Sequence, residues 1–118
     1  MKVKHLVTNE LIEAVVERVT SIDFKLILKE KTRFKWFNWN SYKQHEVYKL
    51  RAEENNKILG LMAIVDHIDP GIDAIEIELL EVSFENTGAN KEVDDIAGCL
   101  IAYACRESFK EGMKDGYF

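Results

Sequence analysis

Apolar positions, in short runs or alternating with polar ones, predict three strands in the middle of the chain. The first covers residues 46–52 and is ended by the polar cluster 53–56. The second covers residues 57–68 and the third residues 72–84, both rich in isoleucine, leucine and valine. Residues 69–71 (Asp-Pro-Gly) predict a tight turn between them, because proline presets φ and glycine accepts a positive φ. The last two strands therefore form a predicted hairpin.

Helical spacing predicts a helix toward each end of the chain. Residues 2–7 alternate well enough for a short strand, and apolar residues then recur at helical spacing over residues 11–19. Thr8 or Asn9 can cap this first helix. A second apolar stripe runs from Val93 to Cys105. Asp94 or Asp95 suits the start of this second helix and Gly112 its end. Residues 24–28 are apolar but favour neither element.

The third strand contains a break in its alternation. Ile75, Ile77 and Leu79 share one face, whereas the later apolar positions are Leu80 and Val82. A single extra residue shifts a period of two in this way, so a β-bulge is predicted at Leu79–Leu80. A strand buried on both faces near its end is the open alternative.

Composition limits the class of protein. The chain has 118 residues, a net charge of −5 and 47% hydrophobic residues, which predicts one domain over residues 1–118. No apolar run approaches the roughly 20 residues that span a bilayer, and the first residues lack a signal-peptide core. Cys99 and Cys105 would face about 120° apart on one helix, so no disulfide is expected between them. A cytoplasmic protein without membrane contact is the expectation.

Metal and nucleic-acid chemistry have weak support in the sequence. Neither a Cys-x-x-Cys nor a His-x-x-x-His pair is present, and the acids of residues 66–73 lack the spacing of a calcium loop, so no metal is expected. Residues 33–39 are aromatic and basic and could stack bases. A loop that covers the core is the favoured interpretation, because the net charge is only +4 over residues 1–57 and −9 over the rest.

A bulged strand, a loop and a helix that begins on small residues together resemble the GNAT acetyltransferases. Residues 79–83 (Leu-Leu-Glu-Val-Ser) resemble the family's fourth strand, which leads into its acetyl-CoA pyrophosphate loop. Residues 97–101 (Ala-Gly-Cys-Leu-Ile) resemble the start of the following helix, and residues 58–63 the preceding hairpin strand. The similarity covers about residues 46–118 and, more loosely, the N-terminal elements.

The resemblance implies an α/β fold with a mixed, mostly antiparallel sheet and flanking helices. It implies acetyl transfer from acetyl-CoA to a small-molecule or peptide amine. Glu78 and Glu81 lie where a strand glutamate could deprotonate the amine, directly or through water; a solvated face of a half-buried strand is the open alternative for both. A backbone N–H near Leu80 to Val82 would meet the oxyanion, and the phosphates would lie at residues 95–98. The expected cofactor-binding residues are Leu80, Val82, Gly88, Asp95, Ile96, Ala97 and Gly98.

The sequence departs from the family in two places. The family's loop has the pattern R/Q-x-x-G-x-G/A. In one alignment of this sequence only Ala97 fits the pattern, since Glu92 and Asp95 occupy its other defining positions; in the second alignment only Gly88 fits. The family's fifth strand would begin at residues 116–118, so its later strands are expected to be missing. A shortened enzyme, an inactive one and one completed by a second copy all stay open. The alternatives are an interaction domain that dimerises through an open sheet edge and, less favoured, a nucleic-acid-binding module.

Overall fold

The computed structural model describes residues 1–30, 32–69, 72–88 and 91–114. It contains one six-stranded sheet, in which every neighbouring pair of strands is antiparallel, with the order β5-β4-β3-β2-β1-β6. The strands are β1 (Lys2–His5), β2 (Leu11–Arg18), β3 (Glu46–Ala52), β4 (Ile58–Asp69), β5 (Ile72–Val82) and β6 (Val93–Asp94). The helices are α1 (Ser21–Lys29) and α2 (Ile96–Lys114), with 3-10 turns η1 (Trp39–Tyr42) and η2 (Phe84–Asn86).

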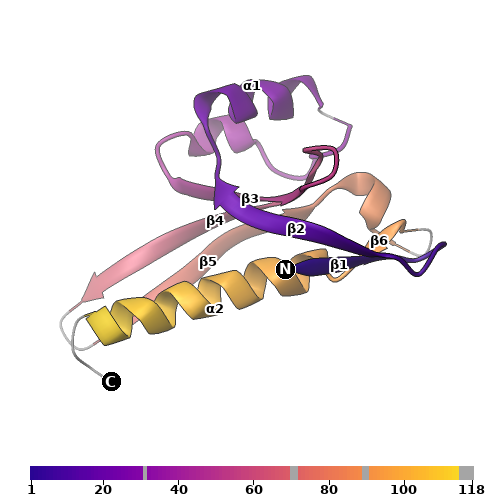
Figure 1. Ribbon diagram of the computed structural model, residues 1–118. Helices are drawn as coiled ribbons and strands as arrows, with labels where there is room; N and C mark the ends of the chain where they lie inside the picture. Colours follow the sequence, from indigo (N-terminus) through magenta and orange to yellow (C-terminus); the bar gives the residue numbers. More distant parts are fainter. Residues whose placement is uncertain (31, 70–71, 89–90, 115–118) are drawn as a thin grey trace.

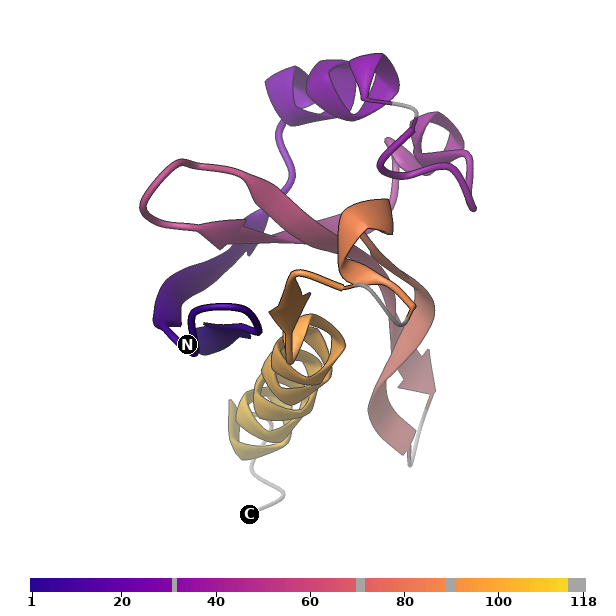
Figure 2. The ribbon, with the colours of Figure 1, turned by 90° about the vertical axis from the view of Figure 1, so that its right-hand side faces the viewer.

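The sheet curls around α2, and α1 lies on its opposite face (Figures 1 and 2). Each face has its own core, because successive residues of a strand point to opposite sides. Met62 and Leu100 belong to the core on the α2 side. Leu61, Phe24 and Trp39 belong to the core on the α1 side. The α+β architecture expected from the sequence is confirmed, but the sheet is antiparallel in all these pairings and not mixed.

The helix predicted over residues 11–19 is wrong, because residues 11–18 form β2. This strand pairs with β1 on one side and β3 on the other, with Val16 opposite Leu50. Ile12, Val15 and Val16 are β-branched, which favours a pleated strand with partners on both edges over a helix. The N-terminal helix is α1, which begins after Thr20.

A capping box marks the start of α1, a segment whose apolar residues favoured neither a helix nor a strand. The Asp23 N–H donates to Thr20 Oγ1 at 3.2 Å, and the Thr20 N–H donates to Asp23 Oδ2 at 2.9 Å. These two bonds satisfy donors that a helix start otherwise leaves without partners. The Thr-x-x-Asp spacing before residues 24–28 was the available sequence signal for this helix.

The predicted hairpin is confirmed, since β4 and β5 pair from Gly60 opposite Val82 to Asp69 opposite Ile72. The residues of the predicted turn, 70–71, lie outside the described residues. The strand predicted over residues 46–52 is β3, with the same bounds.

The β-bulge in β5 is confirmed, one residue before its predicted place. Ala63 pairs with Leu79 and Ile64 pairs with Ile77, so Glu78 is the extra residue. The bulge brings Ile77 and Leu80 to the α2 side, whereas Leu79 packs in the α1-side core. From Leu79 to Val82 the ladder with β4 is continuous, which corrects the predicted slip at Leu79–Leu80.

The last helix begins later and runs further than predicted. Val93 and Asp94 form β6, which pairs with β1, and α2 follows from Ile96. The helix continues through Gly112 to Lys114, so Gly112 does not end it. Residues 115–118, where the family's fifth strand would begin, lie outside the described residues. Among the described helices, none is both long enough and apolar enough to cross a membrane.

Candidate functional site

The end of β5 and the start of α2 enclose a cavity of about 260 Å³. Its lining residues are Val82, Asn86, Lys91, Val93, Asp94, Asp95, Ile96, Ala97 and Gly98. The structure therefore brings Val82 and residues 95–98 of the predicted cofactor site together. Leu80 packs against the α2-side core, and Gly88 lies in the preceding loop with φ 75°; neither lines the cavity.

The start of α2 presents backbone donors to this cavity. The Cys99 N–H donates to the Asp95 carbonyl at 3.0 Å. The N–H groups of residues 96–98 precede this first helical bond and have no partner within the helix. Among the described residues no side chain accepts a hydrogen bond from them. Aligned peptide dipoles make this end of the helix favourable for an anion.

The outer edge of β5 carries further backbone donors. The Ser83 N–H donates to the Leu59 carbonyl at 2.9 Å, toward β4, whereas the Phe84 N–H donates to the Arg33 carbonyl at 2.8 Å, on the opposite side. N–H groups alternate between the two edges of a strand. The N–H groups of Val82 and Leu80 therefore face away from β4, and β5 has no outer strand neighbour among the described residues.

The two aspartates at the mouth of the cavity do not cap α2. Lys91 Nζ lies 2.9 Å from Asp94 Oδ1, and this hydrogen bond, together with one from the Asp95 N–H, holds the pKa of the Asp94 carboxyl below its ordinary value. The Asp95 side chain is exposed to solvent. Both carboxylates are negative charges near the donors, and Lys91 offsets one of them.

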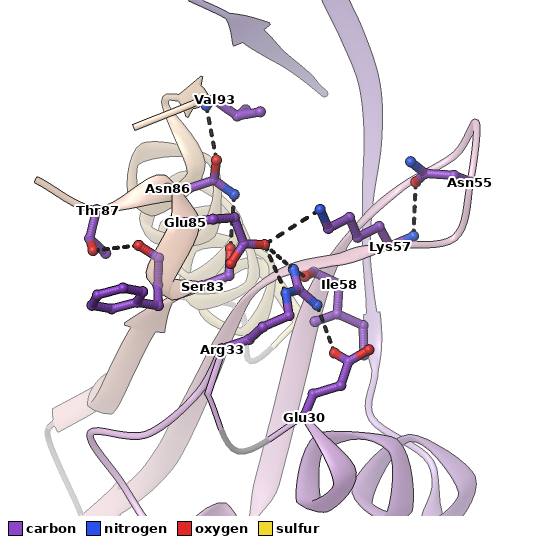
Figure 3. Close-up of polar contacts among 11 residues, drawn as sticks. Glu30, Arg33, Asn55, Lys57, Ile58, Ser83, Glu85, Asn86, Thr87 and Val93 are labelled. Atoms are coloured by element: carbon purple, nitrogen blue, oxygen red, sulfur yellow. Dashed lines mark hydrogen bonds and ion pairs between the residues drawn. The ribbon is translucent and has the colours of Figure 1, made fainter. Parts of the chain in front are cut away.

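Asn86 fixes the loop between β5 and β6, a role that sequence reasoning missed. It is 5% exposed, donates from Nδ2 to Ser83 Oγ at 2.8 Å, and accepts from the Val93 N–H at 2.9 Å (Figure 3). Ser83 is fully buried. A serine and an asparagine three apart, directly after a strand, were the available signal.

An ion-pair cluster ties the same loop to the end of α1. Arg33 donates from Nε to Glu85 Oε1 at 2.8 Å, from Nη1 to Glu30 Oε2 at 2.7 Å and from Nη2 to the Ile58 carbonyl at 2.6 Å (Figure 3). Burial raises the pKa of the Glu85 carboxyl, but hydrogen bonds from Arg33 and from a backbone N–H, together with the positive charges of Arg33 and Lys57, outweigh burial and keep the pKa below its ordinary value. Together with Lys57, these residues border a second cavity of about 650 Å³.

The two predicted catalytic glutamates lie in different surroundings. Glu81 is 3% exposed and accepts from the Trp36 N–H at 2.9 Å and from Trp39 Nε1 at 2.7 Å. It therefore holds the aromatic segment 33–39 against the sheet. Glu78 is exposed at the bulge, with no hydrogen bond or ion pair in the described part of the chain. Of the two carboxylates, Glu78 is the one accessible to an amine.

The aromatic segment is in part the predicted cover of the core. Phe34 and Trp39 are buried, whereas Trp36 and Phe37 are exposed. Arg33, which could have bound nucleic-acid phosphates, is engaged by Glu30 and Glu85.

Within the residues that the structure describes, no three His, Cys, Asp or Glu side chains are arranged to hold a metal ion. The side chains of the predicted acidic group at residues 66–73 lie outside that description. Comparison of the chain with protein-family models, with curated proteins and with solved structures finds no match.

Proposed function

We propose that this chain binds acetyl-CoA along the outer edge of β5 and at the start of α2, and transfers the acetyl group to an amine. One observation carries the proposal. The outward N–H groups of Leu80 and Val82 lie along the edge of β5 that ends at the cavity. The uncapped N–H groups of residues 96–98 lie at the same cavity, because Val82 and residues 96–98 both line it. Acetyl-CoA has an extended pantetheine arm with two amides, followed by a pyrophosphate, and this order of groups matches the order of the donors.

The proposed reaction uses these donors in sequence. The pantetheine amides pair with the β5 edge, and the pyrophosphate accepts from the start of α2, beside Lys91. A backbone N–H near Leu80 to Val82 donates to the thioester oxygen as it gains charge. The amine nitrogen attacks the thioester carbon, Glu78 takes the proton of the amine, and the carbon–sulfur bond breaks to release the CoA thiolate.

The order of the elements agrees only in part with the resemblance to the GNAT family. A helix, two strands, a bulged strand and a long helix follow one another, but two strands precede the first helix, and the short strand β6 lies between the bulged strand and the last helix. In that family a fifth strand follows the long helix. The open outer edge of β5 is where a further strand has room to add.

Thermal unfolding with increasing acetyl-CoA tests the proposal. A ligand that binds only the folded state adds about 2.7 kcal/mol of stability at 100 times its dissociation constant. We expect such a rise, weakened in Lys91→Gln and unchanged in Lys25→Gln, which alters an exposed lysine on α1. Absence of any stabilisation at millimolar acetyl-CoA would contradict the proposal. If acetyl-CoA stabilises the protein, release of free thiol in the presence of amines then tests the transfer step, and Glu78→Gln should slow it.

The open edge of β5 also favours a second candidate, an interaction domain that pairs strand to strand with another copy. Light scattering separates the two candidates. A mass of two chains that acetyl-CoA leaves unchanged, together with no stabilisation by acetyl-CoA, would favour the interaction domain. A single-chain mass would exclude it.

A further inference from the structure

A groove of about 290 Å³ lies between α1 and the aromatic segment, and it shares no lining residue with the cavity of the proposed acetyl-CoA site. It is lined by Ile27, Leu28, Phe34, Lys35, Trp36, Phe37, Asn38 and Trp39. Phe34 and Trp39 are 4% and 2% exposed, whereas Trp36 and Phe37 are 68% and 39% exposed. Two large aromatic side chains thus remain in contact with water beside an apolar, aromatic groove.

The groove is held in shape before any ligand arrives. The buried Glu81 carboxylate accepts from the Trp36 N–H and from the Trp39 indole, so it fixes both the backbone and one ring of the segment. The rings of Phe37 and Trp39 meet edge to face, with centroids 6.3 Å apart. A preformed aromatic surface loses little conformational freedom when it binds a ligand.

Lys35 places one positive charge at the rim of this groove. Its Nζ lies 3.9 Å from the centroid of the Phe84 ring and 6.0 Å from that of Trp36. No carboxylate pairs with it among the described residues, whereas Lys49 and Lys91 each pair with an aspartate. In a chain with a net charge of −5, a cation held between exposed rings is a specific feature.

We propose that this groove binds a small planar aromatic molecule that carries one anionic group. The ring would stack on the exposed faces of Trp36 and Phe37, and the anion would pair with Lys35. Among the described residues that line the groove, Lys35 is the only cationic one, which suits a ligand with a single negative charge. A nucleic-acid strand would need several cations along the segment, and Arg33 is already bound by two carboxylates. The proposal does not depend on acetyl-CoA binding.

A matched pair of probes isolates the charge: 2-naphthoate and its neutral amide, 2-naphthamide. Binding is followed by NMR through the indole N–H signals of the two tryptophans, Trp36 and Trp39. We expect naphthoate to bind about fivefold more tightly than naphthamide, the upper range for a solvent-exposed ion pair. The ratio should fall to about one in Lys35→Gln and stay unchanged in Lys25→Gln, since both lysines are exposed.

A second variant tests the aromatic part of the site. Trp36→Ala should weaken both probes while the unfolding transition is retained, because Trp36 is largely exposed. Equal affinity for the two probes in the unaltered protein would overturn the proposal, as would a preference for naphthoate that survives Lys35→Gln. Displacement of naphthoate by an oligothymidylate at lower concentration than naphthoate itself would also overturn it, in favour of a nucleic-acid surface.

Discussion

Gly60 allows α2 to begin directly against the sheet. A Cβ at this position would lie 2.8 Å from Ile96 Cγ2 and 3.0 Å from Leu100 Cδ1. Ile96 and Leu100 are 2% and 0% exposed, so neither side chain has free space to move into. Gly60→Ala should therefore lower the free energy of unfolding by about 1–3 kcal/mol, the cost of overpacking a core, and weaken acetyl-CoA binding. Denaturant unfolding and the ligand titration measure the two effects.

Gly98, which lines the candidate cavity at the start of α2, provides the matched control. A Cβ there would meet no atom within 4 Å. Alanine has the higher helix propensity, so Gly98→Ala should raise the free energy of unfolding by up to about 1 kcal/mol. Equal destabilisation by both substitutions would show that the close packing of α2 on Gly60 does not cause the loss of stability in Gly60→Ala.

Asp23 makes stability depend on pH. Burial raises the pKa of this carboxyl, but hydrogen bonds from Lys49 and Thr20 outweigh burial and hold the pKa below its ordinary value. The unfolded chain then binds the proton more readily than the folded chain. The contribution of Asp23 is therefore present above the unfolded pKa of about 3.9 and is lost as pH falls through the lower folded pKa.

Asp23→Asn should lower the free energy of unfolding at pH 7 by about 1–3 kcal/mol, since Lys49 loses the closer of its two carboxylate partners, at 2.9 Å, and keeps Glu17 at 3.6 Å. It should also flatten the decline in stability below about pH 4. Urea unfolding at a series of pH values measures both. The exposed pair Lys2–Glu13 is the control, and Glu13→Gln should change stability by less than about 0.5 kcal/mol. The same acid profile in Asp23→Asn and the unaltered protein would refute the assignment.

Strands and helices were predictable from the sequence where the apolar residues fit a single period. The alternation of apolar and polar residues predicted β5 and its bulge. Strand β4 was predictable from its apolar run, because residues 58–64 are buried on both faces of the sheet. Residues 11–18 have apolar positions that fit both periods. These residues form a strand because their side chains are β-branched and because β1 and β3 pair with them on both edges. The pairing is a tertiary interaction, which the local sequence pattern does not contain.

Deleting Glu78 tests the role of the bulge as an element. Without this residue, Ile77 and Leu79 would follow one another on opposite faces, as a regular strand requires, and the pairing with Ile64 and Ala63 would be unchanged. We expect the deletion variant to fold, with a cooperative transition, and to lose acetyl transfer together with the proposed base. Loss of folding on deletion of Glu78, but not in Glu78→Gly, would show that the bulge is needed by the fold itself.

At the scale of the whole molecule, the sequence located one side of the candidate site. The resemblance to the GNAT family predicted that Val82 and residues 95–98 lie together, and they line one cavity. Arg33 and Glu85 are 52 residues apart, and Trp36 and Glu81 are 45 apart. These contacts depend on how α1 and its following segment pack on the sheet, which local patterns do not specify. The groove at Lys35 escaped prediction for the same reason.

Amide mapping by NMR tests the central proposal most directly, because it reports where acetyl-CoA contacts the whole molecule. We expect acetyl-CoA to shift the backbone amide signals of Leu80, Val82 and residues 96–98, while the indole signals of Trp36 and Trp39 stay in place. Shifts confined to other surfaces, or none at saturating acetyl-CoA, would contradict it.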